Sequence, residues 1–115
     1  MQVTDTESIL DREQLRDVTL NDPELMKEIL KTLVDDTSLQ LGRLEQAVRE
    51  ANMSQCARLA HYCKGACANV GANAMATLLK RLELEAVAGK FGEAELCYAS
   101  LPVELERLRH EARSL

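Results

Sequence analysis

The segment from Ala60 to Gly71 reads A-H-Y-C-K-G-A-C-A-N-V-G and has the pattern of a helix in a helical bundle. At about 100° per residue, its small apolar residues and those just before it share one stripe, in alternating steps of four and three: Cys56, Ala60, Cys63, Cys67 and Val70. Such a stripe is the buried face of an amphipathic helix. The segment therefore predicts a helix that packs against other helices.

The opposite face of this helix carries His61, one of only two histidines in the chain. Its neighbours one and two turns away are small: Ala57, Gly65 and Ala68. Lys64 is the only long side chain beside it on that face. Because glycine inside a helix costs about 0.5–1 kcal/mol relative to alanine, Gly65 needs a reason, and clearance around His61 supplies one.

Composition favours a single helical domain. The chain has 115 residues, 46% of them hydrophobic and 3% aromatic, which suits one core of packed helices. The net charge of −5 argues against nucleic acid as a partner. No apolar run approaches the roughly 18 residues of a membrane span, and the polar, acidic start M-Q-V-T-D-T-E-S is unlike a secretory signal. We expect a cytoplasmic monomer.

Apolar periodicity and capping residues divide the chain into helices. Residues 1–8 are expected to be disordered, and residues 9–115 to form one domain. The predicted segments are a short helix capped by Asp11 and ending near Val18, then 23–51, 52–71, 73–88 and 93–115. Gly71 is predicted to cap the third segment, and Pro102 to kink the last without breaking it. The predicted fold is all-α: an up-and-down antiparallel four-helix bundle with a short additional N-terminal helix.

The four cysteines are Cys56, Cys63, Cys67 and Cys97. Three share the apolar stripe, where they resemble small core residues of a protein kept reduced. No nearby histidine or third thiolate completes a tetrahedral set on that face, so no metal site is predicted. A redox or metal role is the least favoured alternative.

A neutral imidazole is a good nucleophile near neutral pH. Exposure of His61 lets a second molecule bring an electrophile to the ring, and Lys64 supplies positive charge for an anionic group. The chain has no Gly-rich phosphate loop of the G-x-x-x-x-G-K-[ST] type and no obvious Mg²⁺ site of its own. It could therefore carry a phosphoryl group but not take one from ATP unaided.

Residues 58–72 closely resemble the signature of histidine-containing phosphotransfer (HPt) domains, A-H-x-L-K-G-x-x-x-x-x-G followed by a Leu-rich helix ending in L-E. This chain has T-L-L-K-R-L-E at 77–83. The histidine, lysine and both glycines match in spacing, and the resemblance extends over most of the chain. Cys63 stands where leucine is usual, and Tyr62 where a small or polar residue is common.

The resemblance implies that His61 is phosphorylated on Nε2, that Lys64 offsets the phosphoryl charge and that Gly65 gives a partner room. It implies a response-regulator receiver domain, or a histidine kinase, as partner. The receiver's own aspartate and Mg²⁺ would supply the catalysis, so no cofactor is expected on this chain. Receivers would dock on the exposed part of the helix, at Ala57, Arg58, Tyr62 and Ala68, with Tyr62 tuning which partners fit.

Two alternatives from other classes remain. One is a non-catalytic adaptor that uses the same fold only to bind a receiver; the intact His61 argues against it. The other is a dimerising histidine-kinase core, which usually carries H-E-x-x-x-P-L. Tyr62 replaces the acidic residue here and no proline follows, so autophosphorylation is disfavoured.

Overall fold

A computed structural model describes residues 8–115 of the chain. Its helices are α1 (Arg12–Val18), α2 (Pro23–Arg49), α3 (Met53–Val70), α4 (Asn73–Val87) and α5 (Phe91–Arg113). The prediction of an all-α bundle with a short N-terminal helix is confirmed. Most of the residues expected to be disordered lie outside the described residues; Ser8, the last of them, accepts a backbone hydrogen bond from Ala74 at 2.9 Å.

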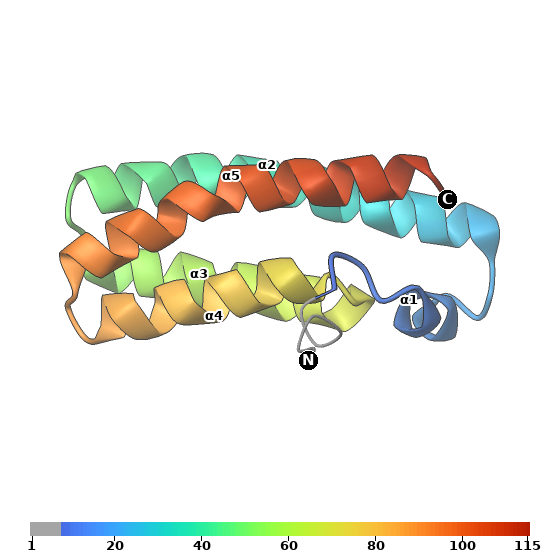
Figure 1. The fold of residues 1–115 in the computed structure, drawn as a ribbon, viewed down its shortest axis with the longest axis horizontal. Helices are drawn as coiled ribbons and strands as arrows, with labels where there is room; N and C mark the ends of the chain where they lie inside the picture. The colour runs from blue at the N-terminus through green and yellow to red at the C-terminus, as the bar shows by residue number, and fades with distance from the viewer. Residues whose placement is uncertain (1–7) are drawn as a thin grey trace.

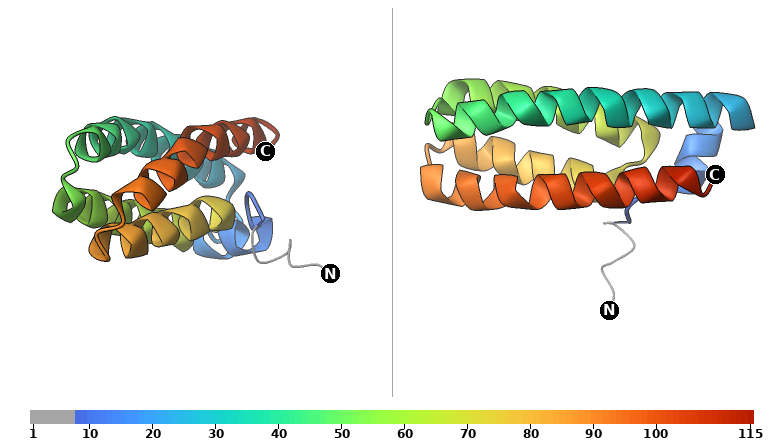
Figure 2. Two further views of the ribbon diagram at one scale, coloured as in Figure 1. Left: turned by 60° about the vertical axis from the view of Figure 1, so that its left-hand side comes forward. Right: turned by 90° about the horizontal axis from the view of Figure 1, so that it is seen from above.

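The four long helices alternate in direction and form two layers, α2 with α5 and α3 with α4 (Figure 1). Each long helix contacts the next one in the chain, and α5 returns to contact α2. The bundle is therefore closed around one core. Seen from above, α2 and α5 run side by side, with α1 set across one end (Figure 2).

Side-chain caps explain where the first three helices begin. Asp11 accepts a hydrogen bond from the backbone of Gln14 at 3.2 Å, and Asp22, beside Pro23, accepts two at the start of α2. Asn52 does the same for α3 through Gln55 at 3.1 Å. These side chains satisfy backbone N–H groups that a helix start leaves unpaired.

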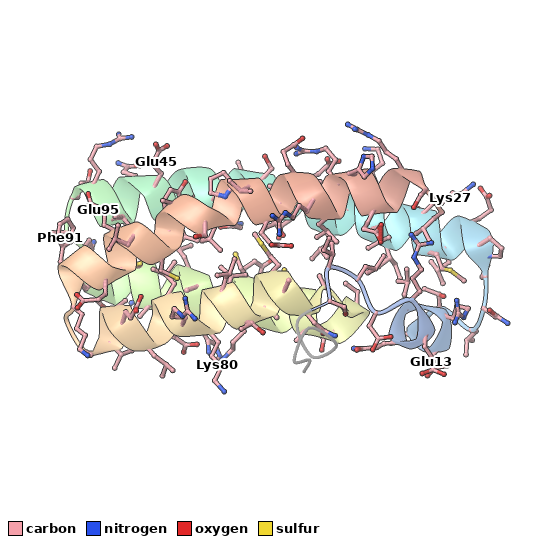
Figure 3. The ribbon with its side chains drawn as sticks, in the orientation of Figure 1. Glu13, Lys27, Glu45, Lys80, Phe91 and Glu95 are labelled. Carbon is pink, nitrogen blue, oxygen red and sulfur yellow. The ribbon has the colours of Figure 1, made fainter. Side chains whose placement is uncertain are left out.

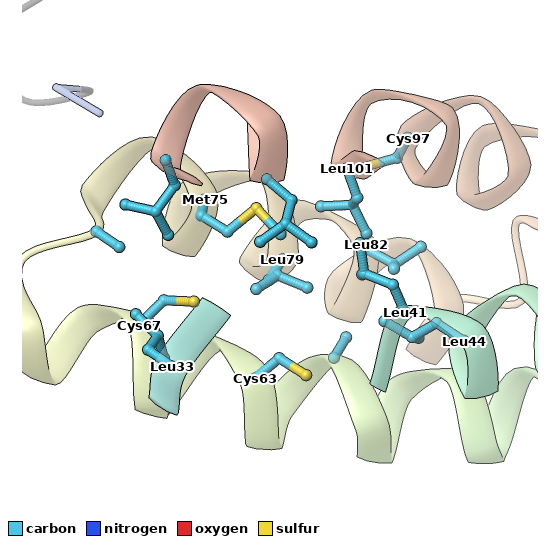
Figure 4. Packing of buried hydrophobic residues seen from close by; sticks show 14 of the residues in the cluster. Leu33, Leu41, Leu44, Cys63, Cys67, Met75, Leu79, Leu82, Cys97 and Leu101 are labelled. Carbon is cyan, nitrogen blue, oxygen red and sulfur yellow. The ribbon is translucent and has the colours of Figure 1, made fainter. Parts of the chain in front are cut away.

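The core consists of the stripes that periodicity predicted. Cys63 and Cys67 of α3 point inward beside Leu33 and Leu79 (Figure 4). The fully or nearly fully buried residues include Leu30, Leu44, Cys56, Ala60, Met75, Leu82, Leu101 and Leu108. Because the core side of α3 is fixed in this way, the side carrying His61 must face out.

Three helix ends lie two residues from their predicted positions: the end of α2, at Arg49, and both ends of α5. The last helix begins at Phe91 rather than Glu93, because Gly89 (φ +71°) ends the α4 turn and Lys90 already occupies the N-cap position of α5. Within α1, Leu15 is fully buried, whereas Val18 at its end is 49% exposed. The continuation of α5 through Pro102 is confirmed, and the helix changes direction between its first and second halves (Figure 1).

Among the described residues, no helix combines the length and the apolar character that crossing a membrane requires.

Candidate functional site

His61 stands on the solvent face of α3 with its side chain 67% exposed. Gly65 and Ala68 on the same face are also exposed, and Ala57 is half-buried. A methyl group built on Gly65 would meet no neighbouring atom within 4 Å. No packing inside the bundle therefore requires a glycine at this position.

Glu83 of α4 links His61 and Lys64. One carboxylate oxygen, Oε2, lies 2.9 Å from Nδ1 of His61, and the other, Oε1, lies 3.0 Å from Nζ of Lys64. Glu83 and Lys64 are largely buried, with side chains 21% and 27% exposed. The exposed imidazole is thus held from behind by a partly buried ion pair.

Glu83 ends the L-E signature of residues 77–83, and the sequence pattern alone assigns it no role. A signal was present: α3 and α4 are joined by a very short turn, and Glu83 lies about as far along α4 as His61 lies back along α3. In an antiparallel helix pair, positions equally distant from the turn lie opposite each other. The register of this hairpin therefore places a carboxylate next to the histidine.

The Glu83 carboxylate determines which nitrogen of His61 is free. Burial alone would raise the pKa of Glu83, but hydrogen bonds from Lys64 and His61 outweigh burial and hold that pKa below its ordinary value. An ionised carboxylate can only accept hydrogen bonds. In the neutral ring Nδ1 must then carry the proton, and Nε2 presents its lone pair to solvent.

Tyr62, the next residue along α3, is 54% exposed. Its hydroxyl donates a hydrogen bond of 3.0 Å to Oδ2 of Asp36 on α2, and this bond raises the pKa of the Tyr62 phenol. The ring lines a groove between α2 and α3 that also contains Ile29, Thr32, Leu33, Ala66 and Val70. The Tyr62 side chain therefore points toward α2, whereas that of His61 points toward α4.

The other predicted site residues lie near this cluster or at the end of α3. Arg58 is exposed on α3. Gly71 ends α3 in the left-handed conformation (φ +90°), and its carbonyl accepts a hydrogen bond from the backbone of Asp11 at 2.8 Å. The carbonyl of Ala68 accepts one from the side chain of Gln14 at 2.7 Å. The C-terminal end of α3 is therefore hydrogen-bonded to α1 and to Asp11, the N-cap residue of α1.

The cysteines lie apart from this surface. Burial raises the pKa of the Cys63 thiol to about 12 and that of the Cys67 thiol to about 11. Such thiols stay protonated near neutral pH and are poor nucleophiles. Within residues 8–115, no group of three or more His, Cys, Asp or Glu side chains is placed to hold a metal ion.

Comparison with known proteins points to one family. The Hpt domain family matches residues 28–114, a range that includes His61, Lys64 and Glu83. No curated protein matches the chain. Among solved structures, the chain is similar to histidine-containing phosphotransfer protein B from Pseudomonas aeruginosa, with a TM-score of 0.86 and 24% identity over 92% of each chain. That likeness supports the fold, and the family match adds the motif around His61.

Proposed function

Because this chain belongs to the family of histidine-containing phosphotransfer domains, we propose that it carries a phosphoryl group on Nε2 of His61 in a two-component phosphorelay. The partner that gives or takes the group is a response-regulator receiver domain or a histidine kinase. One observation carries the proposal: Nδ1 of His61 is bound to Glu83, while the rest of the ring is open to solvent.

The transfer step follows from that arrangement. The Nε2 lone pair attacks the phosphorus of an aspartyl phosphate; the N–P bond forms as the P–O bond breaks, and the aspartate leaves as a carboxylate. Nε2 sheds no proton, because the ring proton is on Nδ1. Positive charge develops on the imidazole, and the Glu83 carboxylate 2.9 Å away stabilises it. The reverse step returns the group to a receiver.

The surroundings of His61 suit access by another protein. Gly65 and Ala68 add almost no bulk on the exposed face of α3, so a partner's active site can close over the ring. Lys64 acts chiefly through Glu83, whose charge it balances at 3.0 Å. We assign the ATP-dependent and Mg²⁺-dependent chemistry to the partner, in keeping with a phosphoryl carrier.

A labelling experiment tests the proposal. The protein is incubated with radiolabelled ATP alone, and then with a histidine kinase and a panel of purified receiver domains. We expect no label from ATP alone, and acid-labile, base-stable phosphate once a suitable receiver is present. His61→Gln should abolish labelling. The matched control is His110→Gln, which removes the other histidine of the chain, exposed on α5, and should leave labelling unchanged.

The alternatives give different results. Labelling from ATP alone would show autokinase activity and contradict the carrier assignment. Label that persists on His61→Gln would place the phosphoryl group elsewhere. A receiver that binds the protein tightly but never transfers label would indicate the adaptor role.

A further inference from the structure

The cations around His61 are not equally available to a partner. Lys64 is partly buried and 3.0 Å from Glu83, so one positive and one negative charge cancel beneath the ring. A transferred phosphoryl group carries roughly 1.5 to 2 negative charges at neutral pH, and the phosphoryl-accepting carboxylate of a receiver is itself negative. Lys64 therefore offers a partner no free positive charge at the buried side of the ring, and a free cation must come from an exposed side chain such as Arg58 of α3 or one on α4.

Lys80 of α4 supplies such a charge. It lines a shallow hollow between α3 and α4, which continues from the His61 face along Lys64, Gly65 and Ala68. Within residues 8–115, no carboxylate forms an ion pair with Lys80. Its side chain is exposed and extends outward from α4, away from the layer of α2 and α5 (Figure 3).

The position of Lys80 is fixed relative to the site. It precedes Glu83 by three residues on the same helix, so the two side chains are neighbours on one face of α4. Glu83 is turned inward to His61 and Lys64, whereas Lys80 is turned to solvent. The hollow thus combines a small-residue wall from α3 with a free ammonium group from α4.

We propose that Lys80 is a docking and specificity residue that attracts acidic side chains of the receiver domain bordering its phosphorylated aspartate. This inference rests on the proposed function. Lys80 acts on encounter: an exposed charge raises the association rate of oppositely charged partners and is screened by salt. It takes no part in bond making, which stays with Nε2 of His61.

The test is single-turnover phosphotransfer from a receiver domain that donates label to the wild-type protein. The transfer rate is measured against protein concentration, giving a maximal rate and a half-saturating concentration. At about 0.01 M ionic strength the Debye length is about 30 Å. Under these conditions Lys80→Ala should lower the ratio of the maximal rate to the half-saturating concentration about three- to tenfold. The maximal rate should stay unchanged, and Lys80→Arg should retain the wild-type ratio.

Two controls test whether the effect depends on the location of Lys80 and on its charge. Lys27→Ala removes one exposed cation from α2, in the other layer of the bundle, and should have little effect. Raising the ionic strength to about 0.15 M, where the Debye length is about 8 Å, should shrink the difference between wild type and Lys80→Ala. Circular dichroism checks that each variant keeps its helices.

The outcomes separate this inference from the proposed function. If no receiver donates label to the wild-type protein, the proposed function fails. If the wild type accepts label but Lys80→Ala matches it at low salt, only the role of Lys80 is wrong. A fall in the maximal rate with an unchanged half-saturating concentration would also overturn docking, since Lys80 would then act on the transfer step.

Discussion

At the scale of single residues, the Glu83 carboxylate decides the chemistry of His61. It accepts from Nδ1 at 2.9 Å and is held ionised by Lys64 at 3.0 Å. A histidine whose Nδ1 proton is bound by a carboxylate has one defined neutral tautomer and one free lone pair. The site is therefore a three-residue unit rather than a lone surface histidine.

We predict that Glu83→Ala removes the preference of neutral His61 for the Nδ1–H tautomer. In the wild-type protein, long-range ¹H–¹⁵N spectra at pH 8 should show the proton of His61 on Nδ1. In Glu83→Ala the population of the Nε2–H tautomer should rise. Phosphotransfer should slow at least about tenfold, because a ring that is wrongly oriented, or that carries its proton on Nε2, has no lone pair directed at the phosphorus. Glu83→Gln keeps an acceptor oxygen and should preserve more of the Nδ1–H form. Identical spectra for wild type and Glu83→Ala would contradict this role.

This residue also marks the limit of reading sites from sequence. His61, Lys64 and Gly65 lie within one helix, so their common surface follows from helical spacing alone. Glu83 is on another helix, and its contact with His61 depends on how α3 and α4 align across the turn at Gly71. That alignment depends on tertiary packing, which no local pattern describes.

At the scale of the helix, Gly65 is a position where the fold does not require glycine but the approach of a partner does. Its position is helical, exposed and free of any atom that a methyl group would touch. The fold should therefore accept alanine there, and even gain stability from it. We infer that the glycine serves the partner, which must approach the helix closely at His61.

We predict that Gly65→Ala raises the free energy of unfolding by about 0.5–1 kcal/mol and slows phosphotransfer. Gly42→Ala is the matched control, because Gly42 is also exposed inside a helix with open space around it. It should give a similar gain in stability with no change in transfer. Urea denaturation and single-turnover transfer measure the two effects. If transfer by Gly65→Ala equals that of Gly42→Ala, the clearance argument fails.

The helices themselves could be predicted because their signals are local. Asp11, Asp22 and Asn52 are caps whose partners are two or three residues away, and the buried stripes follow the helical period. The start of α5 was missed by two residues, since Phe91 and Gly92 resemble a turn in sequence. In the structure Gly89 alone supplies the left-handed residue there, and the helix begins directly after Lys90.

At the scale of the whole molecule, α1 is fastened to the end of the bundle near the site. The Asp11 backbone donates to Gly71 at 2.8 Å, the Gln14 side chain bonds the carbonyl of Ala68, and Arg12 reaches Glu111 of α5 at 3.3 Å. A few polar contacts thus join α1 to α3 and to α5, both of which are far from it in the sequence. The sequence predicts Gly71 as a helix cap, but its contact with the residue that caps α1 becomes visible only in the structure.

This arrangement makes Gly71 doubly restricted. Its φ of +90° lies in the left-handed region, and a methyl group there would come within 2.8 Å of the Asp11 carbonyl oxygen. Gly89 also has a left-handed φ, of +71°, but nothing lies near it. The two glycines therefore share the backbone strain that alanine would add, and only Gly71 adds a collision with the residue that caps α1.

We predict that Gly89→Ala lowers the free energy of unfolding by about 1–2 kcal/mol, the cost of a left-handed alanine. Gly71→Ala should cost about 1 kcal/mol more, because Asp11 must move and its hydrogen bond to Gly71 is lost. Hydrogen exchange should rise in α1 for Gly71→Ala and not for Gly89→Ala, since only the first displaces the cap. Equal losses of stability, with α1 protected in both variants, would mean that the Asp11 contact contributes nothing to holding α1 on the bundle.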